Sequence, residues 1–180
     1  MTPAAYAPTA RALHWLTALF VLSSIPAGVV MIEEGLPRAL QNGLFMFHKN
    51  VGVVILLLVV ARLVVRAVNP PPPLPAGFPA GQARVAHGVH MLLYLFLVIM
   101  AVSGYVRVVA GGFPLELWDA LGVPRLAPRS DPLADQAKFV HWLARFGLVA
   151  LILLHISAAA YHGLVKRDGI VRRMWPAKGA

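Results

Sequence analysis

Four apolar stretches of about twenty residues each constrain the fold of this 180-residue chain more than any other feature. They run approximately from residue 13 to 32, 44 to 65, 89 to 106 and 140 to 164. A helix needs about 20 apolar residues to cross the hydrocarbon core of a bilayer, so each stretch is long enough to span a membrane. Hydrophobic residues make up 59% of the chain, well above the usual share in soluble domains. We therefore expect an all-α integral membrane four-helix bundle in which residues 1–180 form a single domain.

The charge and the cysteine content of the chain exclude several classes of protein. The net charge is +9, but the basic residues flank the apolar stretches, where they act as topology signals, so we expect no nucleic-acid partner. Nine of the 16 lysines and arginines fall on the side of the N-terminus, which favours a cytoplasmic location for both termini. The absence of cysteine excludes iron–sulfur clusters, thiolate-ligated haem, covalent c-type haem and disulfides.

All seven histidines lie within or at the ends of the apolar stretches. An imidazole in hydrocarbon without a partner is costly, so this distribution calls for ligands or hydrogen-bond networks. The fourth stretch carries His141, His155 and His162. At about 100° per residue, His155 lies within roughly 40° of the helix face of His141, and His162 within about 20° of the face of His155. His141 and His155 lie roughly 21 Å apart along the axis, close to opposite sides of the membrane. This helix is therefore expected to hold two stacked cofactors.

Because successive helices run in opposite directions, His141 and His155 each have a histidine at the same depth on another helix. His48 reaches the depth of His141 near the outer side, and His14 reaches the depth of His155 near the inner side. Two axial imidazoles from facing helices are what a b-type haem requires. We therefore expect two haem b sites between the helices, with His48 and His141 binding the outer iron and His14 and His155 binding the inner iron.

The presence of His87 and His90 leaves the identity of the partner of His155 open. Both share the inner depth, so either one could replace His14 as the partner of His155. Otherwise they belong to a polar network or a proton path.

The haem propionates need cations, and a porphyrin needs small residues beside it. Lys49 and Arg145, with Lys138, are candidates for the outer propionates, and Arg11 and Lys166 for the inner ones. Residues small enough to let a porphyrin approach the backbone are Gly52, Gly147 and Ala158–Ala160.

The segments between the stretches also carry signals. The second helix is expected to open at Phe47, and the proline run after Asn69 reads as a stiff linker of roughly 15 residues. The third helix then starts near Arg84. The amphipathic stretch Leu115–Leu121 is expected to lie on the membrane surface.

The ordered set of these features resembles the bacterial cytochrome b561 family, the four-helix di-haem cytochromes related to the cytochrome b subunits of nickel hydrogenases and formate dehydrogenases. The resemblance covers nearly the whole chain and rests on these motifs: His14-Trp15, His48, the prolines after Asn69, Ala86-His87 with His90, the His141/His155 pair, and Arg173-Met174-Trp175-Pro176. It implies that the first and fourth helices bind the inner haem and the second and fourth helices bind the outer one. That assignment coincides with the depth argument.

The resemblance also implies a function, which is electron transfer across the bacterial inner membrane between a periplasmic donor and the quinone pool. In part of the family the outer haem is thought to accept an electron from superoxide, and the inner haem to pass electrons to ubiquinone. Superoxide:ubiquinone oxidoreductase is therefore one candidate activity. His162 lies near the inner basic residues and could hydrogen-bond a quinone carbonyl and donate a proton. The alternative for His162 is an imidazole favoured by the helix dipole at a C-terminus.

Two other classes of function stay open. One is an electron-carrying anchor subunit for a partner dehydrogenase or hydrogenase, whose relatives generally bring a fifth helix or docking segments. The other is a transporter without haem, in which the histidines form a proton relay. A relay predicts intramembrane carboxylates, and no Asp or Glu lies in any of the four stretches.

Overall fold

The computed structural model describes residues 5–175, and the elements in that range are all helical. The long helices are α1 (Pro8–Val30), α2 (Arg38–Val68), α3 (Ala80–Ala110) and α5 (Asp131–Ala160). Three short elements complete the described chain: α4 (Glu116–Ala120), the π-helical turn η1 (Tyr161–Lys166) and the 3₁₀ turn η2 (Val171–Arg173).

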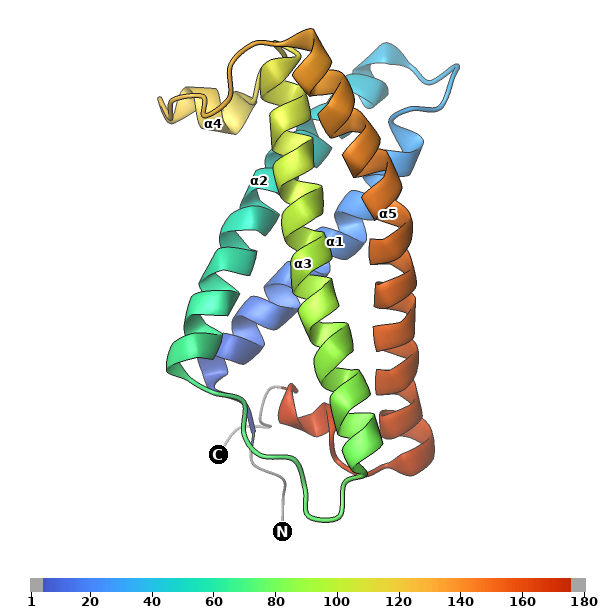
Figure 1. Ribbon diagram of the computed structural model, residues 1–180. Coiled ribbons are helices and arrows are strands. Elements are labelled where there is room, and N and C mark those ends of the chain that lie inside the picture. Colours follow the sequence, from blue (N-terminus) through green and yellow to red (C-terminus); the bar gives the residue numbers. More distant parts are fainter. Residues whose placement is uncertain (1–4, 176–180) are drawn as a thin grey trace.

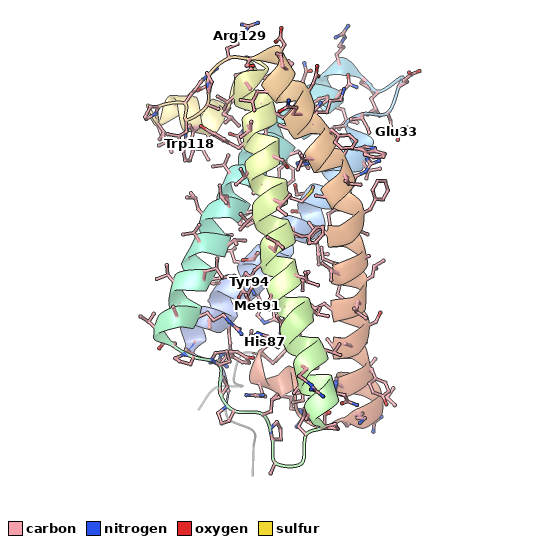
Figure 2. All side chains as sticks on the ribbon, in the orientation of Figure 1. Glu33, His87, Met91, Tyr94, Trp118 and Arg129 are labelled. Atoms are coloured by element: carbon pink, nitrogen blue, oxygen red, sulfur yellow. The ribbon has the colours of Figure 1, made fainter. Side chains whose placement is uncertain are left out.

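Successive long helices run in opposite directions (Figure 1). One end of the bundle, here called the α4 end, holds α4 and the α1–α2 connection. The other, here called the linker end, holds the segment 69–79, η1 and η2. The backbone N–H of Tyr6 donates to the carbonyl of Arg173 at 3.1 Å, so the two ends of the described chain meet at the linker end. Figure 2 places the side chain of Arg129 at the α4 end and that of His87 toward the linker end.

The helices are longer than the apolar stretches that predict them. The expected starts at Phe47 and Arg84 are wrong, because α2 begins at Arg38 and α3 at Ala80. Pro37 and Pro79 occupy the N-cap positions, and a proline there costs no helical hydrogen bond. The linker is accordingly shorter than expected, covering residues 69–79. Hydropathy detects only the part of a helix that suits hydrocarbon, whereas the helix continues into polar residues beyond it.

Large apolar side chains cover the outside of the bundle. Leu19, Leu153 and Val64 are 62%, 61% and 58% exposed. An apolar surface of this extent would not be stable in water, but it suits a hydrocarbon environment. Four helices among the described residues are long and apolar enough to cross a membrane. The prediction of an all-α integral membrane four-helix bundle is confirmed.

The centre of the bundle is a cluster of aliphatic side chains contributed by all four long helices. Val21 of α1, Val59 of α2, Leu97 of α3 and Leu148 of α5 are each at most 8% exposed. Phe96 packs against this cluster. The cluster lies at the middle depth of the helices.

Candidate haem-ligand site

Two pairs of imidazoles lie between the helices, one on each side of the central cluster. His48 of α2 faces His141 of α5 near the α4 end, with ring centres 6.2 Å apart. His14 of α1 faces His155 of α5 near the linker end, also with ring centres 6.2 Å apart. The structure therefore brings together the two pairs that the depth argument selected. Helix α5 supplies one member of each pair.

The spacing of both pairs suits two ligands on opposite sides of one metal. Metal–imidazole bonds of about 2 Å on each side place the ring centres roughly 6 Å apart. His90 lies closer to His155, with ring centres at 5.3 Å. No cluster of three or more metal-ligating side chains is found in residues 5–175. Two imidazoles alone suit a metal that brings its own equatorial ligands, as haem iron does.

The helices that carry the pairs are also suitably arranged. Helix α5 packs closely along α3, whereas its backbone makes few close approaches to α1 or α2. The histidine pairs nevertheless join α5 to those two helices. A flat group between facing imidazoles requires this separation of the backbones.

At the α4 end, backbone carbonyls hold both imidazoles in one orientation. The Nδ1–H of His48 donates to the carbonyl of Ser24 at 2.9 Å, and the Ser24 hydroxyl lies 3.0 Å from the same nitrogen. The Nδ1–H of His141 donates to the carbonyl of Met100 at 2.9 Å, with the Ser103 hydroxyl at 3.2 Å. A carbonyl only accepts, so Nδ1 carries the ring proton and Nε2 keeps its lone pair for a metal.

Two glycines make room for the same imidazoles. A Cβ added to Gly28 would lie 2.7 Å from Cε1 of His48, and one added to Gly104 would lie 3.1 Å from Cε1 of His141. Sequence reasoning missed both glycines and the serines and carbonyls beside them. The one available signal was the pairing of a small polar residue with a nearby glycine, as in Ser24 with Gly28 and Ser103 with Gly104.

At the linker end, His14 has a different partner. Nη2 of Arg62 lies 3.2 Å from Nδ1 of His14. A guanidinium only donates, so this Nδ1 accepts and the ring proton sits on Nε2. Binding a metal through Nε2 would require the proton to move to Nδ1, and Arg62 would then need another acceptor. The α4-end pair is thus ready for a metal in its present hydrogen bonding, and His14 is not.

Two of the cations proposed for the outer propionates, Lys49 and Arg145, make different kinds of contact within the protein. Lys49 donates to the carbonyl of Pro114 at 2.7 Å and pairs with Glu116 at 2.8 Å. The guanidinium of Arg145 lies over the rings of Phe146 and Trp142, at 4.6 and 5.5 Å. The buried Nε of Arg145 has no hydrogen-bond partner among residues 5–175.

The expectation that a porphyrin lies beside Gly147 is wrong, whereas the same expectation for Gly52 is compatible with the structure. A Cβ on Gly147 would lie 2.3 Å from the ring of Phe96, so the phenyl ring fills the space reserved there for a porphyrin. Gly52 faces open space, with no atom within 4 Å of an added Cβ.

His162 lies in the π-helical turn beyond α5, away from both pairs. Its Nδ1 is 2.5 Å from the Asp168 carboxylate, and its ring stacks on Phe78 with centres 5.9 Å apart. Burial by itself raises the pKa of Asp168, but hydrogen bonds from His162 and from the backbone of Ile170 outweigh it and hold that pKa below its usual value. Asp168 also lines a pocket with Phe78, Gln82 and Lys166. π-Helical turns occur frequently at functional sites.

A model of the prokaryotic cytochrome b561 family matches residues 5–177, which include all four long helices. The chain belongs to the prokaryotic cytochrome b561 family. Membership in this family means b-type haem binding and electron transfer in a bacterial membrane. The paired imidazoles of this family member fit that cofactor in spacing, and at the α4 end also in tautomer.

Curated relatives agree with the family assignment. The chain is 29% identical over 174 residues to cytochrome b561 homolog 2 of Escherichia coli strain K12, covering 96% of this chain and 92% of the relative. It is 30% identical over 171 residues to a protein of Yersinia pestis named probable superoxide oxidase CybB, covering 92% and 93%. It is 27% identical over 177 residues to cytochrome b561 homolog 1 of E. coli, covering 92% and 94%.

Proposed function

We propose that this b561 family member is a single-domain di-haem cytochrome that moves electrons across the bacterial inner membrane, from a periplasmic donor to ubiquinone. The observation that carries the proposal is the pair of equal imidazole spacings, 6.2 Å at each end of α5. His48 and His141 would bind the haem at the α4 end, and His14 and His155 the haem at the linker end. When bound, each haem iron supplies one-electron chemistry by alternating between the ferric and ferrous states.

The protein contributes orientation and the exclusion of water. The carbonyls of Ser24 and Met100 keep the Nδ1 proton of each α4-end imidazole in place, which fixes the ring and raises its basicity as a ligand. The aliphatic cluster between the two pairs keeps water from the middle of the bundle. A dry interior of this kind tunes the potentials of buried redox centres.

The linker end is proposed to face the cytoplasm. The described chain begins and ends there, and eight of the fifteen lysines and arginines in residues 5–175 lie at that end, a small excess in the direction of the positive-inside rule. They are Arg11, Arg62, Arg66, Arg84, Lys166, Arg167, Arg172 and Arg173. The α4 end would then face the periplasm.

Superoxide is the proposed donor. The Yersinia pestis relative is named a probable superoxide oxidase. Exposed cationic side chains at the α4 end, Arg38, Arg129 and Lys138, would steer a small anion toward the outer pair. In balance, two superoxide anions each lose one electron to give two molecules of oxygen. The two electrons, with two protons from the cytoplasm, convert one ubiquinone into ubiquinol.

His162 is the proposed contact for the quinone carbonyl and the proton donor at the linker end. The lowered pKa of Asp168 keeps its carboxylate ionised, so it can hold the Nδ1 side of the imidazole. The Nε2 side stays available for a ligand or a proton. The alternative, a histidine with only a helix-terminal structural role, predicts no effect of His162 on turnover.

Arg145 and Lys49 remain proposed partners of the outer propionates. The orphaned Nε of Arg145 supports its role, because a buried donor without an acceptor is costly. Lys49 would have to leave Glu116 to take such a role.

The test is reconstitution of the purified haem protein in liposomes containing ubiquinone, with superoxide generated enzymatically. We expect ubiquinol to form at one molecule per two superoxide anions consumed, and superoxide dismutase to abolish it. His48→Ala should stop the reaction, and His162→Ala should slow it while both haems are retained. Ubiquinol formation that is insensitive to dismutase, or absent from a protein with both haems, would contradict superoxide as the donor.

A further inference from the structure

We propose that Arg62 and Arg66 of α2 bind the propionate carboxylates of the haem at the linker end. The inference deepens the proposed function and rests on it, since it requires a haem between His14 and His155. It replaces the expectation that Arg11 and Lys166 fill this role. Arg11 donates to the carbonyl of Trp175 at 2.9 Å, and the Lys166 ammonium lies 5.9 Å from the Tyr161 ring centre.

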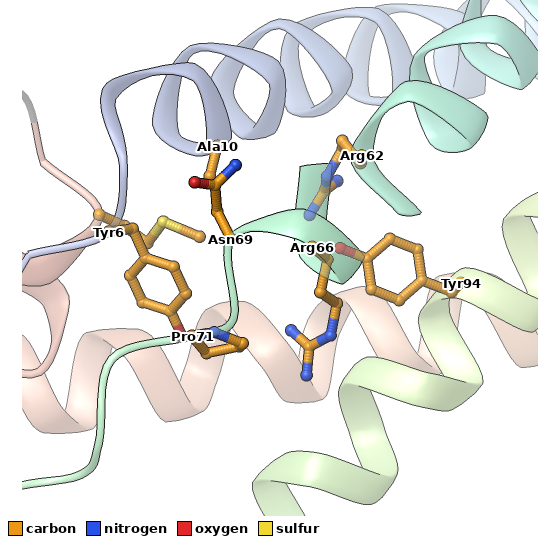
Figure 3. Close-up of a pocket in the computed structure, with 8 residues that line it drawn as sticks. Tyr6, Ala10, Arg62, Arg66, Asn69, Pro71 and Tyr94 are labelled. Carbon is orange, nitrogen blue, oxygen red and sulfur yellow. The ribbon is translucent and has the colours of Figure 1, made fainter. Parts of the chain in front are cut away.

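Arg62 and Arg66 line one pocket beside the inner imidazoles. The two residues are one helical turn apart, so they share a face of α2. Figure 3 shows Arg62, Arg66 and Tyr94 gathered on one side of this pocket, with Tyr6, Asn69 and Pro71 on the other. Arg62 reaches to 3.2 Å from the ring of His14. The Arg62 guanidinium therefore adjoins a proposed axial ligand, and Arg66 lines the same pocket one turn further along α2.

No carboxylate within residues 5–175 forms an ion pair with the arginines of this pocket. The ion pairs in residues 5–175 join Lys49 to Glu116, Arg125 to Asp119 and His162 to Asp168, and none includes Arg62 or Arg66. Like charges one turn apart repel each other, and cations within a membrane span are costly without a partner. Both effects favour an anion in the pocket. A carboxylate suits an arginine fork through two parallel hydrogen bonds.

The hydrogen bonding of His14 also indicates that Arg62 has to change its partner when a metal is bound. A metal bound through Nε2 of His14 would leave the ring proton on Nδ1. Nδ1 and the Arg62 guanidinium would then both be donors, and two donors cannot form the hydrogen bond that joins them now. The Nη2 of Arg62 that faces His14 then needs another acceptor. The Arg62 guanidinium also lies over the ring of Tyr94, 5.1 Å from the centre, which keeps it inside the pocket.

The test is a redox titration of each haem in Arg62→Gln and Arg66→Gln. Arg84→Gln is the matched control, because Arg84 is an exposed arginine at the same end of the bundle. Loss of a cation beside the propionates disfavours the reduced, more negative state. We expect the inner haem to become at least tenfold harder to reduce, which is a fall of about 59 mV in its midpoint potential. The outer haem should titrate as in wild type, and His48→Ala assigns the inner potential by leaving that haem alone.

The outcomes separate this inference from the proposed function. If wild-type protein holds two haems and both potentials in Arg62→Gln and Arg66→Gln match the Arg84→Gln control, only the arginine assignment is overturned. If wild-type protein holds no inner haem, the proposed function fails with it. Should Arg62→Gln lose both haems, Arg66→Gln and Arg62→Lys carry the test, and Arg62→Lys should restore haem binding. Unchanged potentials together with loss of co-purified anionic phospholipid would assign the pocket to lipid headgroups and overturn the inference.

Discussion

At the scale of single residues, helices that supply no ligand to a pair determine how its imidazoles lie. Ser24 and Gly28 of α1 hold and accommodate His48 of α2. Met100 and Gly104 of α3 do the same for His141 of α5. The histidines could be predicted because imidazoles are conspicuous in apolar helices. The carbonyl acceptors could not, since every residue carries one and only the packing of helices selects which is used.

Gly28→Ala should remove the haem at the α4 end and leave the other. The new methyl group would lie 2.7 Å from Cε1 of His48, so the imidazole must shift from its carbonyl partner. Such overpacking costs about 1–3 kcal/mol. Gly43→Ala is the control, because an added Cβ there meets nothing within 4 Å and helix propensity should make it neutral or stabilising. The haem-to-protein ratio checks both variants, and full haem content in Gly28→Ala would contradict the proposed placement of His48.

The inner partner of His155 can be tested in the same way. His14→Ala should lose one haem, whereas His90→Ala should keep two, because only the His14–His155 spacing of 6.2 Å equals that of the outer pair. His90 is 5.3 Å from His155, closer than two ligands of one iron would be. Absorption spectra of the two purified variants decide the matter. The reverse pattern would transfer the ligand role to His90.

At the scale of elements, α5 and α4 have contrasting roles. Helix α5 carries one histidine of each pair, so its length sets the separation of the two sites. Helix α4 instead packs beside α2 about three turns from its start, through Glu116, which accepts from Lys49 and Asn50 at 2.8 Å each. The amphipathic stretch Leu115–Leu121 contains this short helix, but its partners on α2 are distant in sequence and only the folded chain brings them together.

Glu116→Gln should loosen α4 without removing haem. Burial by itself raises the pKa of Glu116, but hydrogen bonds from Lys49 and Asn50 outweigh it and lower that pKa. Because the carboxyl pKa is lowered, the stabilisation from these hydrogen bonds is fully present above about pH 5 and is lost as the pH falls through the lowered pKa. The group is partly exposed, so we expect less than about 1 kcal/mol. Hydrogen exchange of residues 113–126 should rise in Glu116→Gln at pH 7, with Glu34→Gln as the exposed control. Equal exchange in both variants would show that these hydrogen bonds contribute nothing.

At the scale of the whole molecule, the four spans alternate in direction, so both termini lie on one side of the membrane. The orientation then has two possibilities, with the linker end facing either the cytoplasm or the periplasm. The number of spans and their order could be predicted from hydropathy, because lipid requires long apolar helices. Their ends at Pro8 and Arg38 could not, because a helix continues past the hydrocarbon until a proline or a cap ends it.

The orientation can be tested with single cysteines, because the chain has none of its own. Glu34→Cys at the α4 end should react with a membrane-impermeant maleimide in intact cells. Ala76→Cys in the linker should react only after the membrane is permeabilised. The opposite labelling pattern would place both termini in the periplasm.

The central claim is that α5 holds two haems between paired histidines, and the haem-to-protein ratio tests it most directly. Pyridine haemochrome analysis of the purified chain, with a reduced-minus-oxidised spectrum, should give two b-type haems per chain with low-spin bis-histidine character. His48→Ala and His14→Ala should each give one. A wild-type chain with one haem would contradict one of the pairs, and a chain with none would leave the histidines as a polar relay.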